Sequence, residues 1–211
     1  TFMAKWKTEL AGSSMHLHLS LWDKDSQQNL FVGDEKIGPV QASDIFRWFL
    51  GGWMAHARAI TPFYAPYPTS YKRYVYQSWA PTTIAWSYDN RTAGFRVVGH
   101  DQSLRIECRI PGADANPYLV VAAVLAGIHH GITNGIAPQE PVVGDGYSQD
   151  GGVALPIRWP LALQQFADGE ILKPYLGETW CDAFHTARSF EAENHHFTIP
   201  SLDFEWYLRT A

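Results

Sequence analysis

Residues 14–22 alternate between apolar and polar side chains, and this alternation constrains the fold more than any other part of the sequence. Successive side chains of a β-strand point to opposite faces, so His16, His18 and Ser20 share one face. The other face is apolar and suits a core, with Met15, Leu17, Leu19 and Leu21. Two imidazoles beside a hydroxyl on a rigid strand favour metal or phosphate chemistry. A hydrogen-bonded structural role for the histidines is the simpler alternative.

A second strand, expected at 104–110, repeats this design with charged residues. Arg105, Glu107 and Arg109 share one face, and the opposite face carries Ile106, Cys108 and Ile110. A carboxylate between guanidiniums stays ionised because neighbouring cations lower its pKa. The alternative is a solvated sheet face with ion pairs of little energetic value. A histidine and a glutamate on separate strands would give a divalent metal two ligands, which fits Mn²⁺, or Mg²⁺ if the other ligands are oxygens.

Several arginines lie between or on these strands: Arg73, Arg91, Arg96, Arg105 and Arg109. The guanidinium fork matches carboxylate and phosphate oxygens, so converging arginines suit an anionic substrate and a nucleotide tail. Any one of them alone is more simply explained as a surface ion pair. The combination of metal-type and phosphate-type residues is what favours an enzyme.

Composition excludes several other classes. The net charge of -5 and the absence of a Lys/Arg run argue against nucleic-acid binding. Two cysteines are too few for a disulfide framework. Cys108 shares the apolar face of its strand and is expected in the core. No apolar run approaches the roughly 20 residues of a membrane span, and no signal peptide is recognisable, so we expect a cytoplasmic protein without membrane contact. The aromatic content of 14% suits extensive packing or subunit contacts.

The order of predicted elements favours an α+β fold, because strands and helices mix without βαβ regularity. A helix from Asp44 to about Ile60 begins after the N-cap Ser43, and another begins near Asn116 with Pro117 in its first turn. The remaining strands are expected at 1–8, 29–32, 83–88 and 94–98, and the remaining helices at 160–167, 171–176, 178–195 and 201–210. The pairs His129-His130 and His195-His196 lack acidic partners at metal spacing, which indicates structural or surface roles.

The segment Gly12–Ser20 resembles the histidine signature of the glutamine synthetase family, GSGMHxHxS. Further family motifs follow in the family's order: Ser70-Tyr71-Lys72-Arg73, Asn90-Arg91, Arg96, Arg105 to Arg109, and Ala115-Asn116-Pro117-Tyr118. The resemblance is strong from Thr1 to about Ile136 and weaker beyond. It implies the C-terminal portion of a catalytic domain of this family, with an antiparallel sheet and flanking helices. Residues 1–136 would carry the active-site motifs, and residues 137–211 would be mostly helical.

The resemblance implies an ATP-dependent ligase that forms γ-glutamyl phosphate and displaces phosphate with an amine. By motif, His16 and Glu107 look like ligands of an Mg²⁺ or Mn²⁺ ion, and Arg91 and Arg96 like catalytic arginines that also bind ATP. Further ATP contacts are implied at His18, Ser20 and Arg105. Contacts to glutamate are implied at Gly12, Arg73, Arg91 and Arg109.

Three positions depart from the family pattern. Trp79 stands where ammonia-using members carry a glutamate just before Ala-Pro, and a neutral indole can neither deprotonate ammonium nor attract it by charge. An indole can stack on a larger amine, so we expect an acceptor larger than ammonia, such as a polyamine. Ala11 replaces a frequent asparagine, and Gln102 replaces a common nucleotide-side lysine.

Two other functions stay open: glutamine synthetase proper, and a non-catalytic relative used for binding or assembly. The family's N-terminal β-grasp domain and its Glu-x-Glu metal ligands are not among these residues. The 211 residues alone are therefore expected to supply part of an active site and not to catalyse. The resemblance also implies a homo-oligomeric, dodecamer-like ring.

Overall fold

Four strands form the main sheet in the order β1-β7-β6-β5, in a computed structural model that describes residues 1–147 and 152–209. Their bounds are Leu17–Leu19 for β1, Trp86–Tyr88 for β5, Phe95–Val98 for β6 and Arg105–Cys108 for β7. β1 and β6 each pair antiparallel with β7, whereas β5 pairs parallel with β6. The α+β class is confirmed, but the sheet is mixed and not purely antiparallel.

The strand register sets the centre of the polar sheet face. His18 of β1 and Arg96 of β6 both lie opposite Glu107 of β7, one on each side. Directly opposed residues on neighbouring strands have their side chains on the same face and close together. The sheet therefore surrounds one carboxylate with side chains from three strands.

Two small two-stranded sheets complete the β-structure. One is the hairpin of β2 (Glu35–Ile37) and β3 (Val40–Ala42), and the other pairs β4 (Thr83–Ile84) with β8 (Val153–Ala154). The hairpin was not predicted. Its turn is Gly38-Pro39, with Gly38 at φ 57°, a left-handed conformation that favours glycine. The Gly-Pro pair is a turn signal that could have indicated it.

The helices that were predicted lie close to their expected positions, whereas α2 and η1 were not predicted. The longer ones are α1 (Asp44–Tyr64), α3 (Pro117–Asn134), α4 (Trp159–Asp168) and α6 (Glu178–Phe197). The shorter ones are α2 (Pro68–Tyr71), the 3₁₀ helix η1 (Asp101–Ser103), α5 (Lys173–Leu176) and α7 (Ser201–Tyr207). Helix α1 runs one turn beyond the predicted end, with Pro62 inside its last turn. Position 210, in the last predicted helix, lies outside the described residues.

Capping explains where two of these helices begin. The Ser43 hydroxyl accepts a 3.2 Å hydrogen bond from the backbone of Phe46 at the start of α1. Asn116 caps α3 through its side-chain oxygen, and Pro117 occupies the first turn, where its missing N–H costs nothing. Both predicted starts are confirmed.

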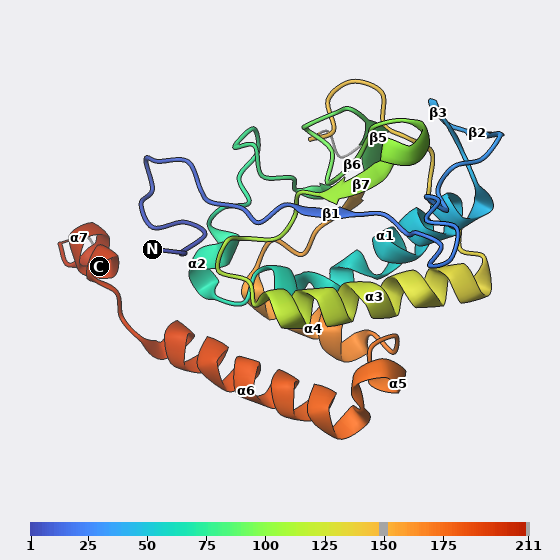
Figure 1. The fold of residues 1–211 in the computed structure, drawn as a ribbon. Helices are drawn as coiled ribbons and strands as arrows, with labels where there is room; N and C mark the ends of the chain where they lie inside the picture. Colours follow the sequence, from blue (N-terminus) through green and yellow to red (C-terminus); the bar gives the residue numbers. More distant parts are fainter. Residues whose placement is uncertain (148–151, 210–211) are drawn as a thin grey trace.

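The helices lie on one face of the main sheet, with α1 and α3 next to it and α4 and α6 further away (Figure 1). The two inner helices cross closely, because a Cβ at Gly131 would stand 2.3 Å from Cα of Gly52. Core rings fill the space below the sheet, with Trp53 packed edge-on against Phe95 at 5.3 Å. The opposite sheet face is left for the polar cluster.

Two predicted strands are absent. Residues 1–8 form no strand; instead the Ala4 carbonyl accepts a 2.8 Å hydrogen bond from Ser13 N, which folds this segment back as a loop. At 29–32 the Asn29 side chain accepts from Phe31 N and donates to the Leu104 carbonyl. Asparagine side chains that bond nearby backbone favour turns over strands, so this segment turns.

The C-terminal helices extend from the body, and α7 lies apart from the other helices, near the chain's start (Figure 1). The exposed apolar side chains from Phe190 onward are Phe190, Phe197, Ile199, Leu202, Phe204, Trp206, Tyr207 and Leu208. Within residues 1–147 and 152–209, no helix combines the length and the apolar character needed to cross a membrane.

Candidate functional site

Glu107 is the centre of the polar cluster, although only 3% of its surface is exposed. Its carboxylate accepts 3.0 Å hydrogen bonds from Arg96 Nη1 on one oxygen and Arg109 Nη1 on the other. His16 Nδ1 lies 2.9 Å from Oε1, and His18 Nε2 lies 3.7 Å from the same oxygen. Strands β1, β6 and β7 and their extensions therefore converge on one charged group.

The cluster keeps Glu107 ionised. Burial alone would raise its pKa, but the hydrogen bond from Arg96 and the charges of Arg109, His16 and Arg96 outweigh burial and lower the pKa below its usual value. The expectation of an ionised carboxylate between guanidiniums is thus supported, with one correction. The second guanidinium is Arg96 on the neighbouring strand and not Arg105, whose Nε lies 3.4 Å from His18 Nδ1.

His16 is a neutral imidazole in this arrangement. Burial, followed by the charge of Arg109, lowers its pKa. Because the carboxylate only accepts hydrogen bonds, Nδ1 of His16 donates to Glu107, and Nε2 is an acceptor 3.0 Å from the Ser14 hydroxyl. Ser14 was not among the predicted site residues, although its position two residues before His16 could have indicated it.

The His16–Glu107 pair suits two neighbouring ligands of one divalent cation. Two ligands at right angles on Mg²⁺ or Mn²⁺, with bonds of about 2.0–2.2 Å, stand about 3 Å apart. The observed separation of Nδ1 and Oε1 is 2.9 Å. Over the described residues, no group of three or more His, Cys, Asp or Glu side chains has metal-binding geometry. The pair therefore forms part of a possible metal site, and further ligands would have to come from elsewhere.

Arg109 connects the carboxylate to the turn that carries Arg91. Its Nη1 binds Glu107, while its Nε donates a 3.1 Å hydrogen bond to the Arg91 carbonyl. Arg91 and Arg96 line one open hollow of about 1010 Å³, together with Lys36 and Asp89. Asp89 also pairs with Arg96, a contact that the sequence analysis missed because the two residues meet across paired strands.

Gly12 and Arg73 lie against each other, because a Cβ at Gly12 would stand 2.6 Å from Cγ of Arg73. Arg73 is 4% exposed as a residue, and its guanidinium donates to the Ile110 carbonyl and lies 4.9 Å from the centre of the Tyr74 ring. Its Nε has no hydrogen-bond partner among the described residues. A buried guanidinium with a free donor suits an anionic substrate.

Other predicted residues lie further from the cluster. The Ser20 hydroxyl, beyond the end of β1, accepts a 2.8 Å hydrogen bond from Trp22 Nε1. Trp79 lies on the loop after Arg73, with 68% of its surface exposed and φ at 65°. Gln102 accepts a 2.9 Å hydrogen bond from the backbone of Asn29 and so has a structural partner.

The histidine pairs lie on helices, away from the sheet face. His129 Nδ1 bonds the Tyr175 hydroxyl at 2.7 Å, and the ring of His130 packs edge-on against His56 at 5.1 Å. His195 and His196 fall in the last turn of α6 and are exposed. These positions agree with the structural or surface roles expected of them. Cys108 is fully buried, as predicted.

Comparison with known proteins identifies the family. The family described as "Glutamine synthetase, catalytic domain" matches residues 1–207, so the chain belongs to the glutamine synthetase family. The chain is 36% identical over 212 residues to gamma-glutamylputrescine synthetase PuuA of Escherichia coli, covering 100% of this chain and 44% of that protein.

Two further proteins are similar to this chain. The gamma-glutamylethanolamide synthetase GlnA4 of Streptomyces coelicolor is 46% identical over 150 residues, covering 71% of this chain and 31% of that protein. A solved structure of a GmaS/ADP complex superposes with a TM-score of 0.86 at 31% identity, covering 99% of this chain and 49% of that one. The chain thus spans less than half the length of each of these relatives.

Proposed function

We propose that this chain belongs to an ATP-dependent ligase that joins the γ-carboxyl of glutamate to an amine larger than ammonia. The observation that carries this proposal is the charged cluster around Glu107 together with the exposed Trp79 on the loop that follows Arg73. The named activities of PuuA and GlnA4 support an amine acceptor. The chain would supply the C-terminal portion of the catalytic domain, with active-site motifs in residues 1–136 and mostly helices in 137–211.

The chemistry proceeds in two steps. The γ-carboxylate oxygen of glutamate attacks the terminal phosphorus of ATP, forming γ-glutamyl phosphate and releasing ADP. The amine nitrogen then bonds to the carbonyl carbon of the γ-glutamyl phosphate, the bond from that carbon to the phosphate oxygen breaks, and the amine loses a proton. Phosphoryl transfer depends mainly on positioning and on stabilising negative oxygens, which is the task for which arginines are suited.

Arg91 and Arg96 would stabilise the transferring phosphoryl group, because both line the same hollow and both carry permanent charges. His18, Ser20 and Arg105 would contact the nucleotide with them. The similarity to a GmaS/ADP complex supports a nucleotide here.

Arg73, Arg91, Arg109 and the Gly12 backbone would bind glutamate. The free Nε of Arg73 supports this assignment, because a buried donor without a partner costs free energy until a ligand supplies an acceptor.

His16 and Glu107 would hold Mg²⁺ or Mn²⁺, which when bound neutralises phosphate charge. Neutral His16 and ionised Glu107 have the charges that metal ligands need, and metal binding at Nδ1 would move the His16 proton to Nε2, where the Ser14 hydroxyl can accept it. The remaining ligands would come from phosphate, water or residues outside this pair. We further propose a cytoplasmic homo-oligomeric ring that binds neither nucleic acid nor membrane.

A product analysis tests this function. The full-length protein is incubated with glutamate, ATP and Mg²⁺ or Mn²⁺, with ammonia or one of a panel of monoamines, diamines and hydroxyalkylamines. We expect γ-glutamyl amides from at least one amine at a kcat/KM at least tenfold above that for ammonia. Efficient glutamine formation without any better amine would instead support glutamine synthetase proper, the second candidate. Absence of nucleotide and metal binding would indicate a non-catalytic relative.

A further inference from the structure

Tyr147 comes from the connection after α3, yet the strand and turn residues of the site hold it in place. Only 6% of its surface is exposed. The preceding Gly146 donates from its N–H to the Thr92 hydroxyl and accepts at its carbonyl from the Thr83 hydroxyl, each at 2.7 Å. Asn90 Nδ2 donates to the Gly144 carbonyl at 2.7 Å. This segment is therefore attached to the same turn that carries Arg91.

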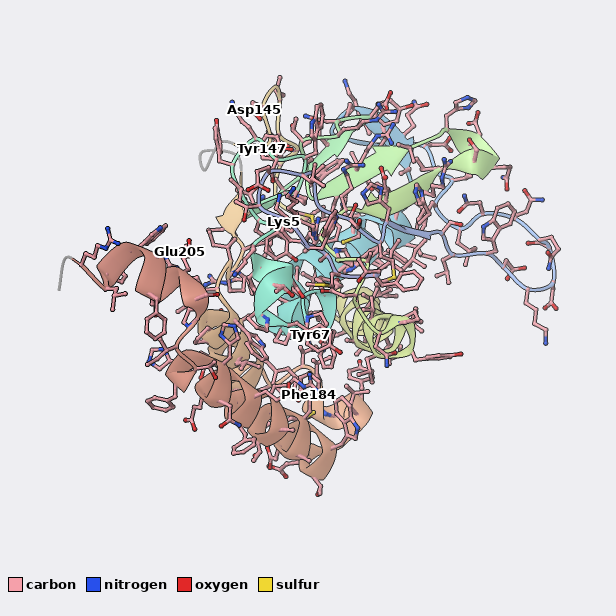
Figure 2. All side chains as sticks on the ribbon, turned by 90° about the vertical axis from the view of Figure 1, so that its left-hand side faces the viewer. Lys5, Tyr67, Asp145, Tyr147, Phe184 and Glu205 are labelled. Atoms are coloured by element: carbon pink, nitrogen blue, oxygen red, sulfur yellow. The ribbon has the colours of Figure 1, made fainter. Side chains whose placement is uncertain are left out.

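Figure 2 shows Asp145 and Tyr147 together at the sheet end of the molecule, far from Phe184 on α6. The Asp145 carboxylate accepts a 3.0 Å hydrogen bond from Tyr147 N. This bond fixes the backbone at the residue that carries the phenol. Hydrogen bonds at the backbone of Tyr147 and at the neighbouring Gly146 give the Tyr147 side chain a defined direction. Tyr147 thus has the rigidity that a specificity-determining group requires.

The surroundings of the phenol connect two parts of the site. Its ring packs edge-on against Tyr76 at 5.8 Å, and Tyr76 belongs to the same loop as Trp79. Burial raises the pKa of Tyr147, while the backbone of Trp79, close enough to act as a hydrogen-bond donor, and the charge of Arg109 act in the opposite direction. The phenol is therefore neutral, next to the Trp79 backbone and within range of the charge of the arginine that binds Glu107.

The phenol oxygen is buried and has no well-formed hydrogen bond among the described residues. Buried polar atoms without partners are uncommon because each costs free energy, and a bound ligand is one way to satisfy them. Tyr76 presents apolar ring surface beside it, and the exposed Trp79 belongs to the same loop. A ligand that offers an N–H donor and a carbon chain matches this combination.

We propose that Tyr147 is a specificity-determining residue for the amine acceptor: its phenol oxygen accepts a hydrogen bond from the amine, while Tyr76 and Trp79 cover the carbon chain. This inference rests on the proposed ligase function and names the chemistry of its acceptor subsite. Ammonia has an N–H donor but no carbon chain, so it gains little from the rings. Tyr147 takes no part in the bond changes and acts through binding alone.

The test is Tyr147→Phe in the full-length protein, which removes the hydroxyl and keeps the ring. We expect the KM for the best amine to rise about tenfold with kcat within twofold, the loss of one hydrogen bond to the substrate. The KM values for glutamate and ATP should stay unchanged. Tyr175→Phe is the matched control, because its hydroxyl bonds His129 on the helical side of the molecule.

An unchanged amine KM in Tyr147→Phe overturns this inference, and so does an equal rise in the KM for glutamate or ATP, which would indicate a structural role. If Tyr147→Phe is unstable, Tyr147→Leu is the second test. Loss of the ring should reduce the preference for long amines over short ones. If the unmodified protein makes only glutamine, the proposed function itself fails. If it uses amines and both variants behave like it, only the assignment of Tyr147 fails.

Discussion

Arg96 and Glu107 face each other across β6 and β7, with Arg96 Nη1 3.0 Å from Glu107 Oε2. The same carboxylate also binds Arg109 and His16, and Arg96 has a second carboxylate partner in the exposed Asp89. Removing one member of a buried ion pair leaves an uncompensated charge and is far more costly than losing an exposed pair. The stability of the sheet face and the chemistry proposed for it therefore rest on the same group.

Glu107→Gln should lower the free energy of unfolding by about 3–5 kcal/mol, because Arg109 would remain buried without a counter-charge and Arg96 would keep only its exposed partner Asp89. The control is Glu35→Gln, which breaks an exposed pair with Arg47 and should cost about 0–1 kcal/mol. Denaturant unfolding of both variants measures the difference. Equal losses would show that the cluster around Glu107 is no more important than a surface pair.

Trp79→Glu should shift the acceptor preference toward ammonia, raising the ratio of glutamine to γ-glutamyl amide at least tenfold. A carboxylate at this exposed loop position attracts ammonium and can accept its proton, whereas an indole does neither. Competition assays with equal ammonia and amine measure the ratio by mass spectrometry. Trp6→Glu, at another exposed tryptophan, should leave it unchanged. An unaltered ratio in Trp79→Glu would remove Trp79 from the acceptor site.

Gly131→Ala should destabilise the helical layer by about 1–3 kcal/mol, because its Cβ would stand 2.3 Å from Cα of Gly52 and the backbone of α1 would have to move. Gly127→Ala, on the same helix, is the matched control. Its Cβ would meet nothing nearer than 3.4 Å, so the helix propensity of alanine should stabilise the protein by up to about 1 kcal/mol. Thermal unfolding of both variants should move in opposite directions.

The free energy of unfolding should fall as the pH is lowered below about 6.5, in part because of His56. Burial, together with the neighbouring His130, lowers the pKa of His56 from 6.5 to about 4 in the folded protein. The unfolded chain therefore binds one more proton in this window, so the free energy of unfolding falls as the pH decreases from 6.5 to 4. His56→Gln should flatten this dependence by one proton, whereas the exposed His195→Gln should not. Unfolding curves recorded between pH 4 and 7.5 provide the comparison, and identical slopes would contradict the assignment.

The 211 residues expressed alone should form no γ-glutamyl product, although they contain the whole cluster around Glu107. Their described residues provide a pair of metal donors and no larger donor group. The measurement is phosphate release with glutamate, ATP and the preferred amine, compared with the full-length protein. Turnover by the isolated polypeptide would refute this expectation.

Local patterns predicted the elements whose causes are local. The alternation around His16 and Glu107 predicted both site strands, and Ser43 and Asn116 predicted two helix starts. The partners across strands were not predictable in the same way. That Arg96, and not Arg105, binds Glu107 follows from the register of β6 on β7, which a single strand's sequence does not contain.

The same limit explains other differences. The expected strand at 29–32 had a suitable composition, but Asn29 bonds residues that lie more than 70 positions later in the chain. Tyr147 had no motif around it, and its place beside the site comes from hydrogen bonds to Thr83 and Thr92 through its neighbour Gly146. Such long-range contacts become visible only when the chain is folded.

Arg109 holds the carboxylate of Glu107 and the backbone of Arg91 at once, whereas Trp79 lies on an exposed loop outside that bonded network. Substitutions in the loop can therefore accumulate without disturbing the arginines that would handle phosphate. An ancestral enzyme with this layout could exchange one nitrogen donor for another through a few loop changes. This separation allows the amine acceptor to change during evolution while the way of activating glutamate stays the same.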